Sequence, residues 1–171
     1  MPYDLSIESV SVINRNIITL EIDVEKTLIL LKPDAVQRQL VGPIITRFEQ
    51  RGLKIVALKL VQVSTALAEE HYAVHKGRPF YNDLISYITS GPVVALVLSG
   101  PKAIQVARST VGTTNPVEAG PGTIRGDYGL EIGRNLVHGS DGPDTAKAEI
   151  ALWFGEAPVD YDRDLDKWIL E

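Results

Sequence analysis

The sequence predicts an α/β (α+β) sandwich, with helices packed on a four-stranded antiparallel sheet. Two continuous apolar runs, residues 27–31 and 93–98, predict strands buried on both faces. A third stretch, residues 53–63, alternates apolar and polar side chains and predicts a half-buried strand with a bulge near residues 57–58. Strands and helices alternate along the chain from residue 27 onward. This order fits the ferredoxin-like βαββαβ plan.

Five segments between the strands carry helix signals. Gly and Pro residues mark most of their ends, and apolar side chains recur at helical spacing. The predicted helices are one opened by Gly42-Pro43 and ended by Gly52, one capped by Ser64 or Thr65 and running to His75, one containing Leu84 and Ile88, one opened by Pro101 and one from Pro143 to Phe154.

The second predicted helix places Leu67, His71 and Val74 on one face. His71 and His75 stand four residues apart, a spacing at which two imidazoles can share a metal ion. No third ligand type lies nearby in the sequence. Packing or solvent exposure is therefore the favoured interpretation of both histidines.

Composition excludes several classes of protein. The 171 residues suit one domain with a sizeable core. The net charge of −5, from 22 acidic and 17 basic residues, argues against nucleic acid as the main partner. The absence of cysteine excludes disulfides and thiolate chemistry. The longest apolar run, residues 93–98, is too short to cross a bilayer, and no secretory signal pattern is present, so we expect a cytoplasmic protein without a membrane partner.

The segment 112–133 is the longest irregular stretch, and such loops are often functional. Its glycines, at 120, 122 and 126, have the wrong spacing for a dinucleotide-binding turn. A phosphate-binding G-x-x-x-x-G-K-[ST] loop occurs nowhere in the sequence.

The segment Asn135–Asp141 concentrates the chemistry. It holds His138 beside a hydroxyl and a carboxylate, just before a predicted helix start at Gly142-Pro143. An imidazole can act as a nucleophile, and free N–H groups at a helix start attract anions. A turn or capping residue is the alternative interpretation. Cationic groups that can bind phosphate occur elsewhere in the sequence, at Lys32, Arg78, Arg108 and Arg125, and all of these except Arg108 lie beside a Gly or Pro turn or near an element end.

Several separated motifs occur along residues 25–171. They are the segments 27–34 with 36–38, His71-Tyr72, Arg78-Pro79-Phe80, 90–94, Thr114-Asn115-Pro116, 121–127 and 135–141. Together they resemble the nucleoside diphosphate kinase family, and N-x-x-H-G-S-D is the most diagnostic motif among them.

The resemblance implies a ping-pong transfer of the γ-phosphoryl group from a nucleoside triphosphate to a nucleoside diphosphate through a phosphohistidine on His138. Glu149 would hold the other ring nitrogen. Lys32, Tyr72 and Ser140 would complete the catalytic set. The residues implied in nucleotide binding are Lys32, Phe80, Leu84, Arg108, Thr114, Arg125, Ile132 and Asn135.

The resemblance also implies a base slot in which Phe80 stacks on the base while Leu84 and Ile132 line the sides. Stacking does not distinguish bases, so broad base and sugar specificity is expected. Mg²⁺ is the implied cofactor and would arrive with the nucleotide phosphates. Asp141 would contact the water shell of the ion.

Three features depart from the family or lie outside its pattern. Gly142 replaces a serine, and Pro143-Asp144-Thr145 replaces the usual first helical turn, so we expect a modest change in stability or in histidine position. Residues 1–24 have no counterpart in the family pattern; we expect either a β-hairpin extension or a natural start at Val24, which residues 1–23 would precede. The acidic tail that ends in residues 168–171 is expected to dock on its own domain or on a neighbouring subunit. It resembles the tail of hexameric family members, so the resemblance implies a hexamer, with a tetramer as the alternative.

Two other functions remain as alternatives. The first is a nucleotide-binding or scaffold protein that has lost catalysis, which the presence of every expected catalytic residue type disfavours. The second is a DNA-binding protein, which the net charge and the lack of a basic stripe disfavour.

Overall fold

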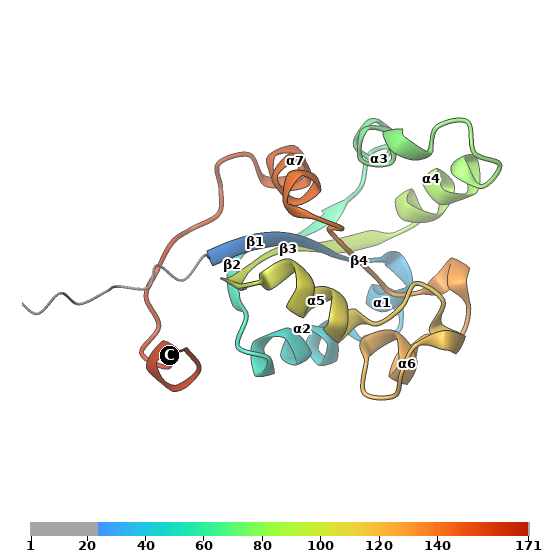
Figure 1. The fold of residues 1–171 in the computed structure, drawn as a ribbon. Helices are drawn as coiled ribbons and strands as arrows, with labels where there is room; N and C mark the ends of the chain where they lie inside the picture. The colour runs from blue at the N-terminus through green and yellow to red at the C-terminus, as the bar shows by residue number, and fades with distance from the viewer. Residues whose placement is uncertain (1–23, 171) are drawn as a thin grey trace, which may run out of the picture.

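The computed structural model describes residues 24–170, and its centre is one antiparallel sheet (Figure 1). The strand order is β2-β3-β1-β4. This arrangement confirms the predicted fold class. The strands are β1 (Val24–Leu31), β2 (Lys54–Gln62), β3 (Pro92–Pro101) and β4 (Val137–Gly139).

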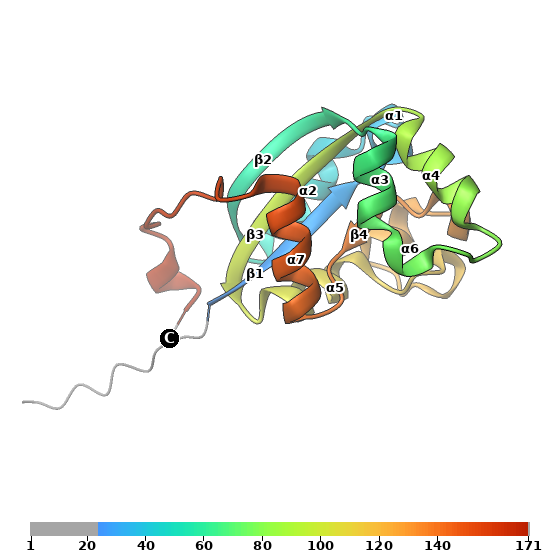
Figure 2. The same ribbon diagram turned by 90° about the horizontal axis from the view of Figure 1, so that it is seen from above.

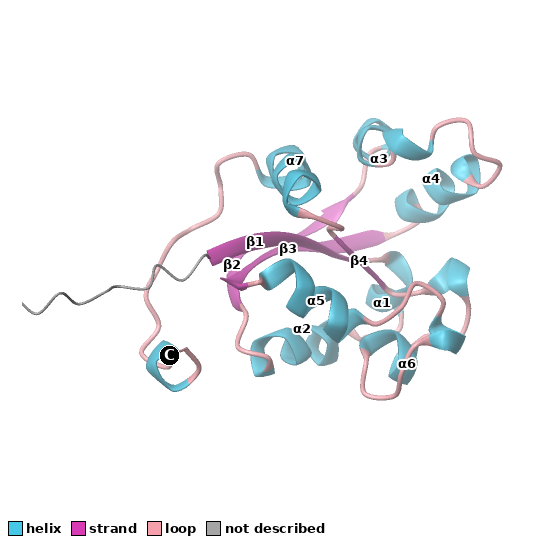
Figure 3. Ribbon diagram, in the orientation of Figure 1, coloured by secondary structure: helices cyan, strands magenta, loops and turns pink. Residues whose placement is uncertain are grey.

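Helices cover both faces of this sheet, as Figures 1 and 3 show from the side and Figure 2 from above. One face carries α3 (Thr65–His71), α4 (Tyr81–Thr89) and α7 (Pro143–Phe154). The other carries α1 (Pro33–Gln37), α2 (Val41–Gln50), α5 (Ala103–Val111) and α6 (Ile124–Tyr128). Short 3₁₀ turns are η1 (Ala73–His75), η2 (Pro116–Glu118), η3 (Ile132–Arg134) and η4 (Asp166–Trp168).

The alternation of side chains along β1 builds two cores. Leu28 and Leu30 pack under α3, α4 and α7, whereas Ile29 and Leu31 pack against α2 and α5. All four side chains are fully buried. Both faces of the strand are therefore apolar, which confirms that the run at 27–31 is a buried central strand.

The outer strand β2 explains the weaker pattern of residues 53–63. A bulge lies between Ile55 and Ala57, close to its predicted place. Leu58 and Leu60 are 54% and 66% exposed, because β2 is at the edge of the sheet. A strand with one free edge and two exposed leucines offers apolar surface to a partner.

Three local expectations need correction. The helix expected to run to His75 ends at His71 and tightens into η1, so Val74 is 84% exposed rather than on a shared face with Leu67. Helix α1 starts directly after Lys32, where only a strand end was expected. Helix α6 and the 3₁₀ turn η2 lie inside the segment 112–133, which was expected to be irregular, and the turn η3 begins near its end.

The C-terminal segment leaves α7 and runs past the edge of β2 toward α2 (Figure 1). The Val159 amide donates to the Val56 carbonyl over 2.8 Å, and the Arg163 guanidinium donates to the Gly52 carbonyl over 2.9 Å. The tail thus docks on its own domain. Trp168 is 82% exposed and does not anchor it.

The described residues contain no helix that is long and apolar enough to span a membrane. The expected N-terminal hairpin lies in residues 1–23, outside the described residues.

Candidate active site

Strand β4 places His138 on the face of the sheet that carries α3 and α7. His138 pairs with Leu30 of β1, whose side chain lies on that face, while its neighbour Val137 is buried on the other. The residue before this pair, Leu136, has a φ of +70°, a left-handed conformation that costs a β-carbon residue about 1–2 kcal/mol. Its amide donates to Asp34 Oδ2 over 3.1 Å, and its carbonyl accepts from the Lys32 amide over 2.8 Å. These two hydrogen bonds hold the strained backbone that leads into His138.

The His138 ring is bound from behind by a carboxylate. Its Nε2 lies 2.9 Å from Glu149 Oε1, and the Ser140 hydroxyl donates to Glu149 Oε2 over 2.6 Å. Ser140 in turn accepts the Leu28 amide over 3.1 Å. Burial alone would raise the pKa of the Glu149 carboxyl. The hydrogen bond and charge of His138, together with the Ser140 hydrogen bond, have a larger opposite effect, so the pKa of Glu149 is below its usual value.

This contact assigns the two ring nitrogens. The ionised carboxylate can only accept a hydrogen bond, so His138 Nε2 carries the proton and donates it. The lone pair of the neutral ring is therefore on Nδ1. A ring nitrogen with a free lone pair in a ring held by a carboxylate is an oriented nucleophile.

His138 lines a cavity of about 580 Å³, a size that suits a small-molecule ligand. The cavity lies at the end of β1 and β4, between η1, α4, α5 and the 112–114 segment. Its expected lining residues are Lys32, Tyr72, Leu84, Arg108, Thr114, Arg125, Asn135, His138 and Asp141. Sequence reasoning missed His75, Gly112 and Thr113, which also line it.

Lys32 and Asn135 form one unit on the cavity wall. Lys32 Nζ donates to Asn135 Oδ1 over 2.7 Å, and Asn135 Nδ2 donates to the Thr114 carbonyl over 2.9 Å. Burial and the charge of Arg125 lower the pKa of Lys32 to about 8, against the opposing effect of Asp34. Lys32 keeps two free N–H donors, so it can both hold Asn135 and meet an anion.

Arg125 is largely committed to the backbone. Its guanidinium donates to the carbonyls of Gly112, Asn135 and Val137 over 2.9, 3.1 and 2.6 Å. Three of its five N–H donors are used in this way, and two remain for a ligand. Burial and the charge of Arg108 lower its pKa to about 10, so it stays charged at neutral pH.

Arg108 and Tyr72 are the more available groups. Arg108 forms an ion pair with Asp141, and both side chains are at least half exposed, so solvent weakens the pair. The Tyr72 hydroxyl is buried and has no hydrogen-bond partner among the described residues. A buried hydroxyl without a partner on the wall of a cavity can pair with a ligand.

Some expected residues lie away from the cavity wall. Glu149 contacts the His138 ring and Ser140 contacts Glu149, and neither residue is among those that line the cavity. Phe80 and Ile132 are 50% and 61% exposed and are not among the lining residues. Of the three residues expected to form the base slot, only Leu84 lines the cavity.

His71 is packed inside the domain, which was one of its two favoured interpretations, but its neighbours were not predicted. Its side chain is 1% exposed, and its ring centroid is 4.7 Å from that of His138. His71, His138 and Glu149 each bring one potential metal-ligating atom within 4.8 Å of the others. The Trp153 indole N–H, however, donates to His71 Nδ1 over 3.2 Å, so a hydrogen-bond network already occupies this trio.

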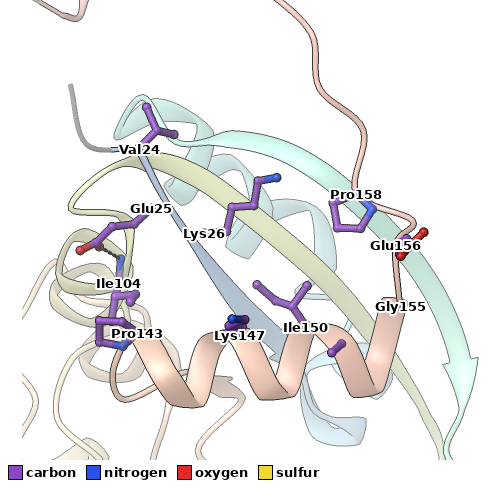
Figure 4. Close-up of a pocket in the computed structure, with 11 residues that line it drawn as sticks. Val24, Glu25, Lys26, Ile104, Pro143, Lys147, Ile150, Gly155, Glu156 and Pro158 are labelled. Atoms are coloured by element: carbon purple, nitrogen blue, oxygen red, sulfur yellow. Dashed lines mark hydrogen bonds between the residues drawn. The ribbon is translucent and has the colours of Figure 1, made fainter. Parts of the chain in front are cut away.

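A second cavity, of about 660 Å³, lies between α7 and the start of β1 (Figure 4). Lys26, Lys147 and Ile150 line it, and Glu25 Oε2 accepts the Ile104 amide over 3.2 Å at its end. Its lining contains no histidine and no convergent hydrogen-bond network. His138 and the side chains of Lys32, Arg108 and Arg125 are at the other cavity.

The comparisons with known proteins agree with this geometry. The family model for nucleoside diphosphate kinase matches residues 25–159, most of the chain. The chain belongs to the nucleoside diphosphate kinase family. Members transfer the terminal phosphate between nucleotides by a ping-pong mechanism through a phosphohistidine, with a divalent cation, and the enzyme is accordingly a phosphotransferase.

The matches to individual relatives cover nearly the whole length of each relative. The enzyme is 60% identical over 148 residues to a nucleoside diphosphate kinase of Roseiflexus castenholzii, covering 86% of this chain and 99% of the relative. A halophilic nucleoside diphosphate kinase from Halobacterium salinarum, solved in complex with CDP, matches with a TM-score of 0.84 and 49% identity over 86% of this chain and 99% of that one. A family protein from Babesia bovis matches with a TM-score of 0.83 and 44% identity over 85% and 99%.

Proposed function

We propose that His138 is the residue that carries the phosphoryl group and that Nδ1 is the atom that attacks. The Nδ1 lone pair forms a bond to the γ-phosphorus, and the bond from that phosphorus to the bridging oxygen breaks. The nucleoside diphosphate leaves with the electron pair. The proton on Nε2 stays hydrogen-bonded to Glu149 throughout, and its 2.9 Å contact is the observation that carries the proposal.

Glu149 and Ser140 act through this imidazole. Attack makes the ring positive, and a carboxylate already bound to Nε2 stabilises that charge without reorganising. Ser140 fixes the second carboxylate oxygen. Both are positioning residues rather than ligands of the nucleotide.

We infer that the cations and the buried hydroxyl on the cavity wall hold the phosphates. Lys32 and Arg125 each have free donors after their protein contacts, and Tyr72 has an unpartnered hydroxyl. Arg108 leaves Asp141 when a phosphate oxygen competes for its fork. Asn135 orders Lys32 and the Thr114 loop, in addition to any contact it makes with the ribose.

Phe80, Leu84 and Ile132 are proposed to hold the base at the mouth of the cavity. The exposure of Phe80 and Ile132 supports this role, because exposed apolar side chains are available to pack on a base. Apolar side chains make no hydrogen bonds to the edges of the base and so do not distinguish one base from another. Broad base and sugar specificity follows. The halobacterial relative holds CDP, a pyrimidine nucleotide, and we expect purine nucleotides to bind here equally well.

Mg²⁺ is the divalent cation we propose. Mg²⁺ keeps several waters and binds through substrate phosphates with one or two carboxylates. Asp141 is the one carboxylate among the residues that line the cavity, which suits an ion held mainly by the nucleotide. The bound ion neutralises phosphate charge.

We further propose a hexamer, with a tetramer as the alternative, and a cytoplasmic location. The exposed leucines of the edge strand β2 support assembly. Light scattering of the purified protein tests the oligomer, and a tetramer mass would contradict the hexamer.

We propose that residues 25–171 form one kinase domain and that residues 1–24 are an extension. Mass spectrometry of the native N-terminus tests the suggested start at Val24.

The function is tested by incubating the protein with γ-labelled ATP and Mg²⁺ without an acceptor. We expect acid-labile, alkali-stable label on the wild type, none on His138→Ala, and removal of the label by GDP or dCDP. A folded wild type that binds nucleotide but takes no label would contradict the proposal and favour a non-catalytic nucleotide-binding protein.

A further inference from the structure

His71 is a buried histidine for which the phosphotransfer described above has no role. It ends α3, which lies beside α7 (Figure 2). Its ring stands at 84° to that of His138 with 4.7 Å between centroids. Tyr72 and Trp153 meet the same ring edge-on, at 4.6 and 5.5 Å. The His138 ring therefore packs against an aromatic neighbour that is itself enclosed.

A hydrogen bond fixes the orientation of this neighbour. The Trp153 indole N–H can only donate, so His71 Nδ1 accepts and the proton of the neutral ring is on Nε2. Trp153 is 3% exposed and belongs to α7. The hydrogen bond from Trp153 therefore fixes His71 to helix α7.

The neutrality of His71 matters to Glu149. Burial and the nearby His138 lower the pKa of His71 to about 3, so the ring is uncharged near neutral pH. Its Nδ1 lies 3.9 Å from Glu149 Oε1, too far for a hydrogen bond. An uncharged His71 does not compete with His138 for the carboxylate, whereas a cationic one would.

We propose that His71, anchored by Trp153, is a positioning residue that fixes the plane of the His138 ring, so that Nε2 stays on Glu149 and Nδ1 stays directed into the cavity. The inference rests on the proposed function, in which His138 Nδ1 attacks phosphorus. An imidazole held by a single hydrogen bond at Nε2 can still change the orientation of its ring plane. In-line attack requires that the Nδ1 lone pair be aligned with the phosphorus. Packing against His71 removes that freedom.

Helix α7 then holds His138 twice. Glu149 and Trp153 are four residues apart and lie on one face of the helix. Glu149 binds the imidazole directly, and Trp153 acts on it through His71. A displacement of α7 would change both contacts together.

Four variants separate these roles. His71→Asn keeps an acceptor near the position of Nδ1 but removes the ring, whereas His71→Phe keeps a ring and removes the acceptor. Trp153→Phe removes the donor and keeps the packing. Trp168→Phe is the matched control, because Trp168 is 82% exposed and is not among the residues that line the cavity.

Phosphoenzyme formation is measured by rapid quench with γ-labelled ATP, and ADP affinity by calorimetry. We expect His71→Asn to form phosphoenzyme about 10-fold or more slowly, since small misalignments cost up to about 100-fold. His71→Phe and Trp153→Phe should be slowed less, and Trp168→Phe not at all. ADP affinity should stay within about twofold in all four, because His71 does not line the cavity.

A ¹⁵N NMR experiment supplies a readout that a purely structural role would not move. The sequence has three histidines, so each can be assigned. In the wild type, His138 should be the Nε2–H tautomer and His71 should stay neutral down to pH 5. In His71→Asn, the His138 signals should report a mixture of tautomers.

The inference is overturned if folded His71→Asn forms phosphoenzyme at the wild-type rate with an unchanged His138 tautomer. If His71→Asn does not fold, Trp153→Phe carries the same test, because it removes the hydrogen bond to His71 and leaves both histidine rings unchanged. A wild type that takes no label contradicts the proposed function instead, so the two failures are distinguishable.

Discussion

Replacing Glu149 by glutamine removes one charge from behind the His138 ring while keeping the shape of the side chain. The carboxylate is 2.9 Å from Nε2, and the two side chains are 12% and 21% exposed, so water screens the pair weakly. Unit charges centred about 4 Å apart interact by about 4 kcal/mol at an effective dielectric constant of about 20. If about half of that interaction is present in the transition state, the loss is about 2 kcal/mol, or about a 30-fold slower step.

Single-turnover labelling with γ-labelled ATP measures this step directly. Glu156→Gln is the matched control, because Glu156 is an exposed glutamate just beyond α7. We expect Glu149→Gln to be slowed about 30-fold with little change in ADP affinity, and Glu156→Gln to behave as wild type. A Glu149→Gln enzyme labelled at the wild-type rate would show that the carboxylate does not stabilise the ring charge.

Three further predictions concern pH and stability. The pKa of Lys32 is about 8 in the folded protein, below its usual 10.5, so kcat/KM for ATP should fall as the pH rises through about 8 and Lys32 loses its charge. The unfolded chain binds more protons at this group between about pH 8 and 10.5, so the free energy of unfolding should rise with pH in that range. A kcat/KM that does not change with pH would exclude Lys32 as a phosphate ligand. Ser140→Ala should lower the free energy of unfolding in urea by about 1–3 kcal/mol, because it leaves the buried Leu28 amide without its acceptor; an unchanged midpoint would refute this account. Gly126→Ala should lower the free energy of unfolding by about 2 kcal/mol or more, because the added Cβ would overlap a backbone carbonyl of the preceding loop. At Gly42 an added Cβ meets nothing within 4 Å, so Gly42→Ala should leave the melting temperature unchanged or raise it.

Elements whose signal is local could be predicted from the sequence. The runs at 27–31 and 93–98 are apolar on both faces because helices cover both sides of β1 and β3, and continuous apolarity is the direct mark of that burial. Helix α7 begins at Pro143 with Gly142 as its N-cap, as the Gly-Pro pair indicated. Glu149 follows on the same helix and reaches His138, as the family resemblance implied.

Features that depend on distant contacts could not be predicted. His71 is 67 positions before His138 in the sequence, and only the packing of α3 beside α7 brings the two rings together. Val74 was misplaced because the change from α-helix to 3₁₀ turn after His71 rotates it into solvent. Helix α6 was missed among glycines, since its five residues are held by the Thr123 cap and by the buried Arg125 rather than by an apolar period.

The side-chain contacts of the basic residues were also beyond the sequence. Arg125 was selected as a phosphate ligand, and the structure shows three of its donors on backbone carbonyls. Asn135 was expected to bind the nucleotide, and its side chain joins Lys32 to the Thr114 loop. Residue type indicates what a side chain can bind, whereas its neighbours decide how many donors remain for a ligand.

The most direct test of the central claim is to identify which nitrogen of His138 carries the phosphoryl group. Phosphoenzyme made with ATP is digested in alkali, and the isomer of phosphohistidine is determined by NMR. Because Glu149 occupies Nε2, the account predicts phosphate on Nδ1. Phosphate on Nε2, or on a residue other than His138, would contradict it.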